Sequence, residues 1–364
     1  MTSTEREIGR DERVALAMSH WGPRFVAQGV DLSDFQRTVE RITRWSDWCR
    51  EWGATAREYE IAAETAEAAG RRRTAAEGWR RAALCWHFGK FVFMEDDEQR
   101  EAASRRTAAC YQRGLWALEP PAERVEVPYD GVLLPGLLRR QAGSRRSPIV
   151  LMIPGLDSVK EELQTTADYF LRRGMATLAI DGPGQGETEF LRHIEPAYER
   201  PVAAVVDWLE QRSDFDLEHL GVFGVSLGGY YAVRAAAFES RITAAIDHAG
   251  AFSLAENWAN RSIISRSAFQ KRSGAASDAE AEERARAIDL TGVAERVECP
   301  LLVVHGKLDP ITPFSDAERV AAAAPKAELA VFEDGNHGLT NRVYESRSLM
   351  ADWMAERLEV ALSS

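Results

Sequence analysis

The chain has 364 residues, of which 45% are hydrophobic and 28% are charged, so it is long enough for one large globular domain or two. Its net charge of −12 excludes the basic excess that would offset phosphate repulsion, and we expect no nucleic-acid partner. No apolar run approaches the roughly 20 residues of a membrane span, so no membrane association is expected either.

The N-terminus and the cysteines indicate the compartment. Residues 1–13 are charged and lack the apolar core of a signal peptide. The four cysteines are scattered without CxxC spacing, at Cys49, Cys85, Cys110 and Cys299. This pattern favours a reducing cytoplasm over a disulfide framework or a zinc site, and no other metal-ligand cluster is apparent. We therefore expect a cytoplasmic protein that needs neither a metal nor a cofactor.

The first third of the chain has the pattern of stacked helices. Apolar residues recur at three-and-four spacing, with few β-branched runs, over residues 34–70, 74–93 and 95–118. Seven of the ten tryptophans lie in this part, and we expect most of them to fill seams between helices. The alternative is that a few line a pocket shared with the following domain. Because the pattern changes at Pro120-Pro121, we place a helical N-terminal domain at residues 1–122.

After this point, short apolar strands alternate with amphipathic helices. A β-hairpin is predicted first, over residues 124–140. Further strands are predicted at 147–155, 175–184, 220–226, 242–250, 299–309 and 327–338, with helices at 160–174, 197–212, from 227, and at 345–362. This alternation predicts an α/β fold with a mainly parallel, doubly wound sheet in a domain spanning 123–364. A polar, helix-prone stretch at about 251–298 interrupts it, and we interpret this stretch as a cap insertion.

One serine in the second domain lies between two glycines. Ser226 stands in a GxSxG pattern with Gly224 and Gly228, and that pattern alone arises by chance in roughly one chain of this length in ten. Here, however, the serine follows a strand and opens a helix, which is the setting of a nucleophile elbow. Glycines on both sides allow the tight turn, because they have no Cβ. We therefore predict a nucleophile, rather than an ordinary serine of a Gly-rich loop.

A serine nucleophile needs a base, and the base needs an orienting acid. In α/β hydrolases these residues follow in the order serine, acid, histidine. Asp309 lies just beyond one predicted strand, and His337 lies at the end of the next. The carboxyl ends of parallel strands meet at one edge of the sheet, where reactive groups are held. The sequence therefore predicts a catalytic triad of Ser226, Asp309 and His337.

Two backbone donors are expected to form an oxyanion hole. Leu227 follows the nucleophile, and Leu156 follows the Pro154-Gly155 pair that ends an earlier strand. Asp157 would then sit beside the chemistry. It either points away to cap a helix starting after Ser158 or handles substrate protons.

Other polar residues near the predicted strand ends have weaker signals. His248 lies at a strand end and is a candidate for contact with substrate, whereas His305 is expected to point into the fold. Residues 181–186, DGPGQG, resemble a phosphate cradle but lack the Lys-Ser/Thr pair of a P-loop and the glycine spacing of a dinucleotide site. We interpret them as a tight strand-to-helix turn.

These motifs together resemble a known family. The helical first domain, PGLDSVKEEL, RGMATLAIDGPGQGE, GVSLGGYYA, HGKLD and DGNHG are similar to the 2,6-dihydroxypseudooxynicotine hydrolase group of α/β hydrolases, which includes bacterial carbon–carbon bond hydrolases and fungal polyketide-shortening hydrolases. The resemblance implies an intracellular homodimer whose helical domain forms a lid over the active site. It implies the same triad, Ser226, Asp309 and His337. The carbon–carbon hydrolase pattern has a glutamate where this chain has Asp157, whose side chain is one methylene shorter.

Three hypotheses about function follow. The first is a serine hydrolase that cleaves an ester or a β-diketone-type carbon–carbon bond of a small aromatic or polyketide-like metabolite. The second is a lyase on the same fold that eliminates acetate from an acetylated polyketide, for example a tetronate intermediate, with His337 or Asp157 as the base. The third is a non-catalytic helical interaction module fused to a silent hydrolase fold.

Overall fold

The computed structural model describes residues 11–143 and 146–360, and the chain divides into two compact units. Unit 1 comprises Met1–Pro121 and unit 2 comprises Ala122–Ser364. The division falls at the start of the first strand, directly after the proline pair. In the described residues, no helix is both long enough and apolar enough to cross a membrane.

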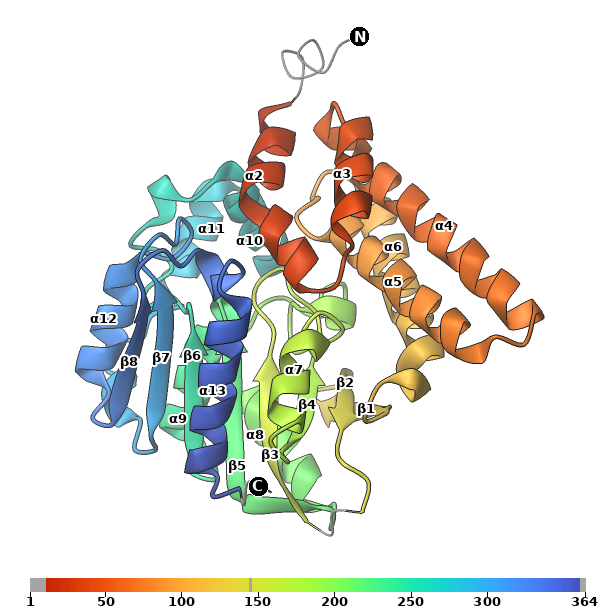
Figure 1. Ribbon diagram of the computed structural model, residues 1–364. Helices are drawn as coiled ribbons and strands as arrows, with labels where there is room; N and C mark the ends of the chain where they lie inside the picture. The colour runs from red at the N-terminus through yellow and green to blue at the C-terminus, as the bar shows by residue number, and fades with distance from the viewer. Residues whose placement is uncertain (1–10, 144–145, 361–364) are drawn as a thin grey trace. The chain divides into compact units, whose positions relative to one another are not determined.

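Unit 1 is helical throughout its described part (Figure 1). Its elements are α2 (Glu12–Ala27), α3 (Leu32–Arg41), η1 (Trp45–Asp47), α4 (Trp48–Ala68), α5 (Arg72–Lys90), α6 (Asp97–Gly114) and η2 (Leu115–Ala117). The long helical stretch predicted from residue 34 to 70 is broken, because the backbone is extended at Ile42, whose side chain is fully buried. Aspartates accept hydrogen bonds from the first turns of α2 and α6, which defines where these two helices start.

Aromatic rings form the core of unit 1. Trp48 and Trp52 are fully buried on α4, and Phe25 of α2 stacks on Phe88 of α5 at 3.9 Å between ring centroids. Large rings of this kind bury much apolar area per residue and so stabilise the contacts between helices. The predicted seam role of the tryptophans is therefore confirmed for these two, whereas Trp116 is exposed. The role of the helical region as a lid stays a prediction.

Unit 2 is built on one eight-stranded sheet. Its strands are β1 (Ala122–Tyr129), β2 (Val132–Arg139), β3 (Ser147–Ile153), β4 (Ala176–Ile180), β5 (Phe215–Val225), β6 (Ala244–His248), β7 (Leu301–Gly306) and β8 (Ala327–Phe332), in the order β1-β2-β4-β3-β5-β6-β7-β8. The first two strands pair antiparallel as the predicted hairpin, β2 pairs antiparallel with β4, and the remaining pairs are parallel. The predicted doubly wound, mainly parallel sheet is confirmed.

Helices cover both faces of this sheet (Figure 1). One face packs against α7 (Gln164–Leu171) and α13 (Val343–Arg357), and the other against α8 (Glu199–Glu210), α9 (Leu227–Phe238) and α12 (Phe314–Ala323). Strands β3, β4, β6 and β7 are buried on both faces, which explains their continuous runs of apolar residues. Helix α7 starts later than predicted, because residues 160–163 form turns.

The stretch between β6 and β7 is helical but irregular. It contains η4 (Trp258–Asn260), α10 (Ile263–Ser273), α11 (Asp278–Ala285) and η5 (Ala294–Arg296). Serine side chains cap both α10 and α11, through Ser262 and Ser277. The segment packs into the same apolar cluster as α8 and α9, through Trp258, Phe269 and Ala281.

Candidate active site

Ser226 lies on a sharp turn between β5 and α9. Its backbone has φ 58° and ψ −124°, a conformation that non-glycine residues rarely adopt. The flanking glycines make the turn possible: a Cβ on Gly224 would stand 1.8 Å from the Gly228 carbonyl oxygen, and one on Gly228 would stand 2.3 Å from the Ile153 carbonyl oxygen. The predicted tight turn is therefore present, and it places Ser226 at the carboxyl end of β5 in front of helix α9.

Two loops at the same sheet edge approach each other closely. Asp309 follows β7, and His337 follows β8 at the start of η6 (His337–Leu339). A Cβ on Gly306 would stand 2.2 Å from the carbonyl oxygen of Gly335, and the Leu308 N–H donates to that carbonyl at 3.0 Å. Close backbone contact between the loops thus brings the acid and the histidine together.

The three side chains form a hydrogen-bonded chain. His337 Nδ1 lies 2.7 Å from Asp309 Oδ2, and His337 Nε2 lies 2.9 Å from Ser226 Oγ. Because a carboxylate only accepts, Nδ1 carries the proton and Nε2 is left to accept from the serine hydroxyl. This is the arrangement that a general base needs in order to take the proton of a serine nucleophile.

The environment of Asp309 keeps it ionised. Burial alone would raise its pKa, but His337 and the N–H groups of Thr312 and Ile311 outweigh burial and lower the pKa. Those N–H groups donate to Oδ1 at 2.9 and 2.8 Å. His305 is fully buried and bonds the Thr312 carbonyl oxygen through Nε2 at 3.0 Å, and burial lowers its pKa to about 4. As predicted, it points into the fold.

The two predicted oxyanion donors belong to backbone segments next to the nucleophile. Leu227 is the first residue of α9, and the first N–H groups of a helix have no acceptor within the helix. Leu156 follows Gly155, whose Cα lies against the serine: a Cβ there would stand 3.1 Å from Ser226 Cβ and 2.9 Å from the Val225 carbonyl oxygen. Both backbone segments therefore border the space in front of Ser226 Oγ.

Asp157 is held by a residue that the sequence analysis did not single out. Arg272, on α10, lies 3.2 Å from Asp157 Oδ1 and also donates to the carbonyl oxygen of Leu156. The same guanidinium forms an ion pair with Glu189 at 2.6 Å. Because α7 begins only at Gln164, no helix starts directly after Ser158 for Asp157 to cap. Asp157 thus contacts a buried arginine that the sequence analysis did not anticipate, and a role for Asp157 in handling substrate protons stays a prediction.

His248 lies at the end of β6, next to the nucleophile turn. Its carbonyl oxygen accepts from the Ser226 N–H at 2.8 Å, and its ring lies 6.0 Å from that of Phe223. The side chain is 5% exposed, and neither ring nitrogen has a hydrogen-bond partner among the described residues. Burial lowers its pKa to about 3, so the ring is neutral. Contact of His248 with substrate stays a prediction.

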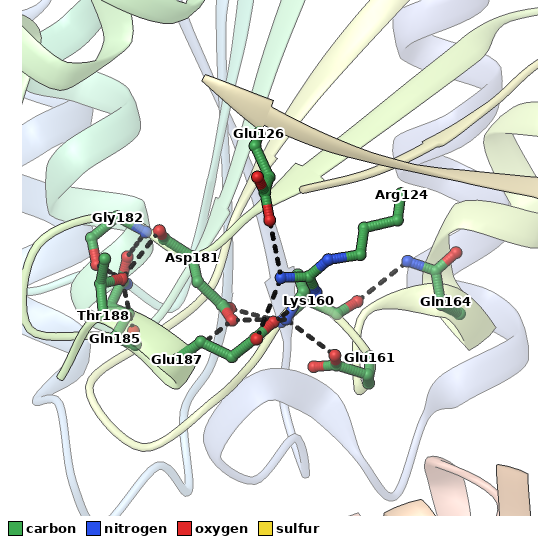
Figure 2. A network of polar contacts seen from close by, with 10 residues as sticks. All are labelled: Arg124, Glu126, Lys160, Glu161, Gln164, Asp181, Gly182, Gln185, Glu187 and Thr188. Carbon is green, nitrogen blue, oxygen red and sulfur yellow. Dashed lines mark hydrogen bonds and ion pairs between the residues drawn. The ribbon is translucent and has the colours of Figure 1, made fainter. Parts of the chain in front are cut away.

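A largely buried polar network surrounds Lys160, in the segment that follows β3 (Figure 2). Lys160 Nζ is fully buried and contacts three carboxylates: Asp181 at 2.8 Å, Glu187 at 2.6 Å and Glu161 at 2.7 Å. Burial opposes the charge of the lysine, but these carboxylates outweigh it and raise its pKa. Burial likewise disfavours the Glu187 carboxylate, yet Lys160 and Arg124 lower its pKa to about 2. The network joins the loop after β3 to the loop after β4.

Sequence reasoning missed Lys160, Gln185 and Arg272 as parts of the site. Lys160 and Gln185 stand in two motifs that the sequence displays, PGLDSVKEEL and DGPGQG, but nothing in either motif shows that the two contact each other through Lys160 and Asp181. Arg272 is separated from Asp157 by more than a hundred residues and gives no local signal. Among residues 11–143 and 146–360, no group of three or more His, Cys, Asp or Glu side chains is arranged to hold a metal ion.

The sheet order, the strand-to-helix turn at Ser226 and the two strand-end loops define the class of protein: this is an α/β-hydrolase fold. The chain belongs to the prolyl oligopeptidase family, whose family model matches residues 161–361.

Individual relatives place the chain more closely. It is 34% identical over 361 residues to the 2,6-dihydropseudooxynicotine hydrolase of Paenarthrobacter nicotinovorans, covering 98% of this chain and 95% of the relative. It is 33% identical over 250 residues to the 20-hydroxy-prefusarin hydrolase of Gibberella moniliformis, covering 63% and 58%. The predicted resemblance to this group of hydrolases is confirmed.

Solved structures agree with this placement. The crystal structure of 2,6-dihydroxy-pseudo-oxynicotine hydrolase superposes with a TM-score of 0.85 at 34% identity and covers 94% of this chain and 98% of its own. The structure of AbyA5 has a TM-score of 0.72 at 21% identity, covering 86% and 85%, and shares the fold.

Proposed function

We propose that this chain is a serine-dependent hydrolase that cleaves an ester or a β-diketone-type carbon–carbon bond of a small aromatic or polyketide-like metabolite. The observation that carries the proposal is the position of His337, within hydrogen-bond distance of both Ser226 and Asp309. The names of the relatives, hydrolases of a pseudooxynicotine and of a prefusarin, support the substrate class.

In the proposed mechanism, His337 Nε2 takes the proton of Ser226 Oγ as the oxygen attacks the substrate carbonyl carbon. The N–H groups of Leu156 and Leu227 donate to the oxyanion that forms. His337 then returns the proton to the leaving group as its bond to the carbonyl carbon breaks, on the alkoxide oxygen of an ester or on the enolate carbon of a β-diketone. Water hydrolyses the acyl-serine by the reverse sequence of proton transfers, and Asp309 stabilises the imidazolium in both halves.

The first test is intact-mass labelling with a fluorophosphonate, on wild type and on Ser226→Ala. We expect one adduct on the wild type and none on the variant, because only an activated serine displaces the fluoride. A folded wild type that takes no adduct, together with a stable protein partner, would favour the non-catalytic module instead.

The second test separates hydrolysis from acetate elimination. Esters, β-diketones and acetylated polyketides are turned over in ¹⁸O-water, and the products are analysed by mass spectrometry. Hydrolysis places the label in the product acid, whereas direct elimination yields unlabelled acetate and an alkene. Because elimination through an acyl-Ser226 would also label the acetate, the alkene is sought in every reaction.

We also propose that the enzyme is a cytoplasmic homodimer. The four free cysteines support a reducing compartment, and the dimer comes from the family resemblance. Light scattering coupled to size-exclusion chromatography of the full chain tests the dimer, and a monomer at micromolar concentration would contradict it.

A further inference from the structure

The segment Pro154–Leu156 lies directly against the proposed nucleophile. A Cβ on Gly155 would come within 3.7 Å of Ser226 Oγ, and a Cβ on Gly228 would stand 2.7 Å from the carbonyl oxygen of Pro154. No side chain fits between this segment and the turn at Ser226. The orientation of the backbone here therefore decides which polar groups face a substrate bound at the serine.

The side chain of Gln185 bonds this segment from the loop after β4. Its Nε2 donates to the carbonyl oxygens of Pro154 at 2.5 Å and Gly155 at 3.3 Å. Its Oε1 accepts from the Gly182 N–H at 3.2 Å and from the Tyr198 hydroxyl at 2.6 Å. The orientation of the amide follows from its partners, because a carbonyl oxygen can only accept and a backbone N–H can only donate. Gln185 is 1% exposed, so water does not compete for these bonds.

Peptide geometry connects this contact to the oxyanion donor. The Gly155 carbonyl and the Leu156 N–H belong to one planar trans peptide, so they point in opposite directions. Because Gly155 has no Cβ, it allows many backbone dihedral angles, and the peptide that follows it can turn easily. Holding the carbonyl on Gln185 turns the Leu156 N–H away from Gln185.

We propose that Gln185 is a positioning residue that keeps the Gly155–Leu156 peptide in the orientation in which its N–H donates to the substrate oxyanion at Ser226. The inference rests on the proposed serine mechanism. It gives the DGPGQG motif a role in catalysis that extends beyond a tight turn.

The loop that carries Gln185 is itself fixed. A Cβ on Gly182 would stand 2.0 Å from the Tyr198 hydroxyl, and Gly186 has a φ of +48° with Asp181 occupying the place of its Cβ. Asp181 accepts from the backbone N–H of Lys160 at 2.8 Å as well as from its Nζ (Figure 2). These contacts hold the backbone on either side of Gln185.

Gln185→Met tests the proposal, because it keeps the length of the side chain and removes its hydrogen bonds. The full-length protein is assayed with a p-nitrophenyl ester and with the matching thionoester, whose sulfur is a poor acceptor for N–H groups. We expect kcat on the oxygen ester to fall about 10- to 100-fold, somewhat less than the loss of an entire oxyanion donor, with KM changed less than about threefold. The thionoester rate falls much less, so the oxygen-to-sulfur rate ratio drops about tenfold.

The control is Gln164→Met. Gln164 is also buried, and its Nε2 donates to the Lys160 carbonyl oxygen at 2.9 Å, whereas the Nε2 of Gln185 donates to Pro154 and Gly155. We expect this variant to keep the wild-type oxygen-to-sulfur ratio even where its stability falls. Should Gln185→Met not fold, Tyr198→Phe removes one donor to Gln185 and shifts the ratio in the same direction by about two- to fivefold.

The outcomes separate the two proposals. If Ser226→Ala abolishes turnover but the oxygen-to-sulfur rate ratio is unchanged in Gln185→Met or Tyr198→Phe, the positioning role is overturned and the serine mechanism stands. If Ser226→Ala keeps the turnover of the wild type, the proposed function is overturned, and the positioning role with it. The same holds if the wild type neither hydrolyses the esters nor reacts with a fluorophosphonate.

Discussion

Lys160→Met removes a buried cation that contacts the buried carboxylates of Asp181 and Glu161 and the half-buried carboxylate of Glu187. The lysine Nζ lies within 2.8 Å of an oxygen of Asp181, Glu187 and Glu161. Methionine has a similar length and no charge, so the substitution leaves the packing volume nearly intact. The loss of stability therefore reports the electrostatic contribution of the lysine.

The expected loss of unfolding free energy depends on the partners that each carboxylate keeps when Lys160 is replaced. Removing one partner of a buried ion pair costs about 3–5 kcal/mol, because a charge is left uncompensated. Glu187 keeps its ion pair with Arg124, and Asp181 keeps two backbone N–H donors. Burial already raises the pKa of Glu161, which favours the protonated, uncharged form of that side chain. These compensations place the loss at the lower end, about 3 kcal/mol. For a domain of about 150–250 residues this lowers Tm by about 6–12 °C.

Pulse proteolysis of the full chain in urea measures this loss, with cleaved peptides of residues 122–364 identified by mass spectrometry. Lys307→Met is the matched control, because Lys307 pairs with Glu333 at 2.8 Å at the surface, where the two side chains are 41% and 76% exposed. Exposed pairs contribute at most about 1 kcal/mol. Equal urea midpoints for the two variants would refute the argument that the buried network stabilises unit 2.

Two further predictions concern titratable groups. Asp309→Asn presents an amide to His337 and favours the tautomer whose proton is on Nε2, which cannot accept the serine proton. We therefore expect kcat to fall about 10⁴-fold. A loss below tenfold in steady-state assays would contradict the triad. Asp247 is 1% exposed, and burial raises its pKa to about 7, with Asp316 adding to the effect. The native state therefore retains a proton that the unfolded chain releases near pH 4, so the free energy of unfolding falls by up to about 4 kcal/mol as pH rises from 4 to 7. Asp247→Asn should flatten this dependence in urea titrations at pH 5 and 8, and an unchanged slope would show that Asp247 is not its source.

Much of the fold could be predicted because its signals are local. The alternation of apolar strands and amphipathic helices after Pro121 is a pattern of neighbouring residues, and it specifies a parallel sheet. The position of Ser226 between two glycines, after a strand and before a helix, is equally local. Asp309 and His337 could be placed near it because parallel strands bring their carboxyl ends to one edge.

The remainder of the site depends on contacts between distant segments. Arg272 contacts Leu156 and Asp157 from the segment between β6 and β7, whose own sequence pattern does not show which distant residues it contacts. Lys160 and Asp181 are both charged residues in turn-like motifs, which in most sequences would be solvated. Their burial follows only from the parallel pairing of β3 with β4, which sets the two following loops side by side.

The loop after β3 needs contacts from other segments to fix the orientation of its backbone next to Ser226. Its backbone must approach Ser226 closely enough that only Gly155 fits, and glycine leaves the adjacent peptide free to rotate. The carbonyl oxygens of this segment are instead bonded from outside, those of Pro154 and Gly155 by Gln185 and that of Leu156 by Arg272. A buried polar network is costly unless every member has its partners, so it persists where a fixed geometry is needed. We therefore interpret Gln185, Arg272 and the charged residues around Lys160 as the groups that hold the Gly155–Leu156 peptide in one orientation.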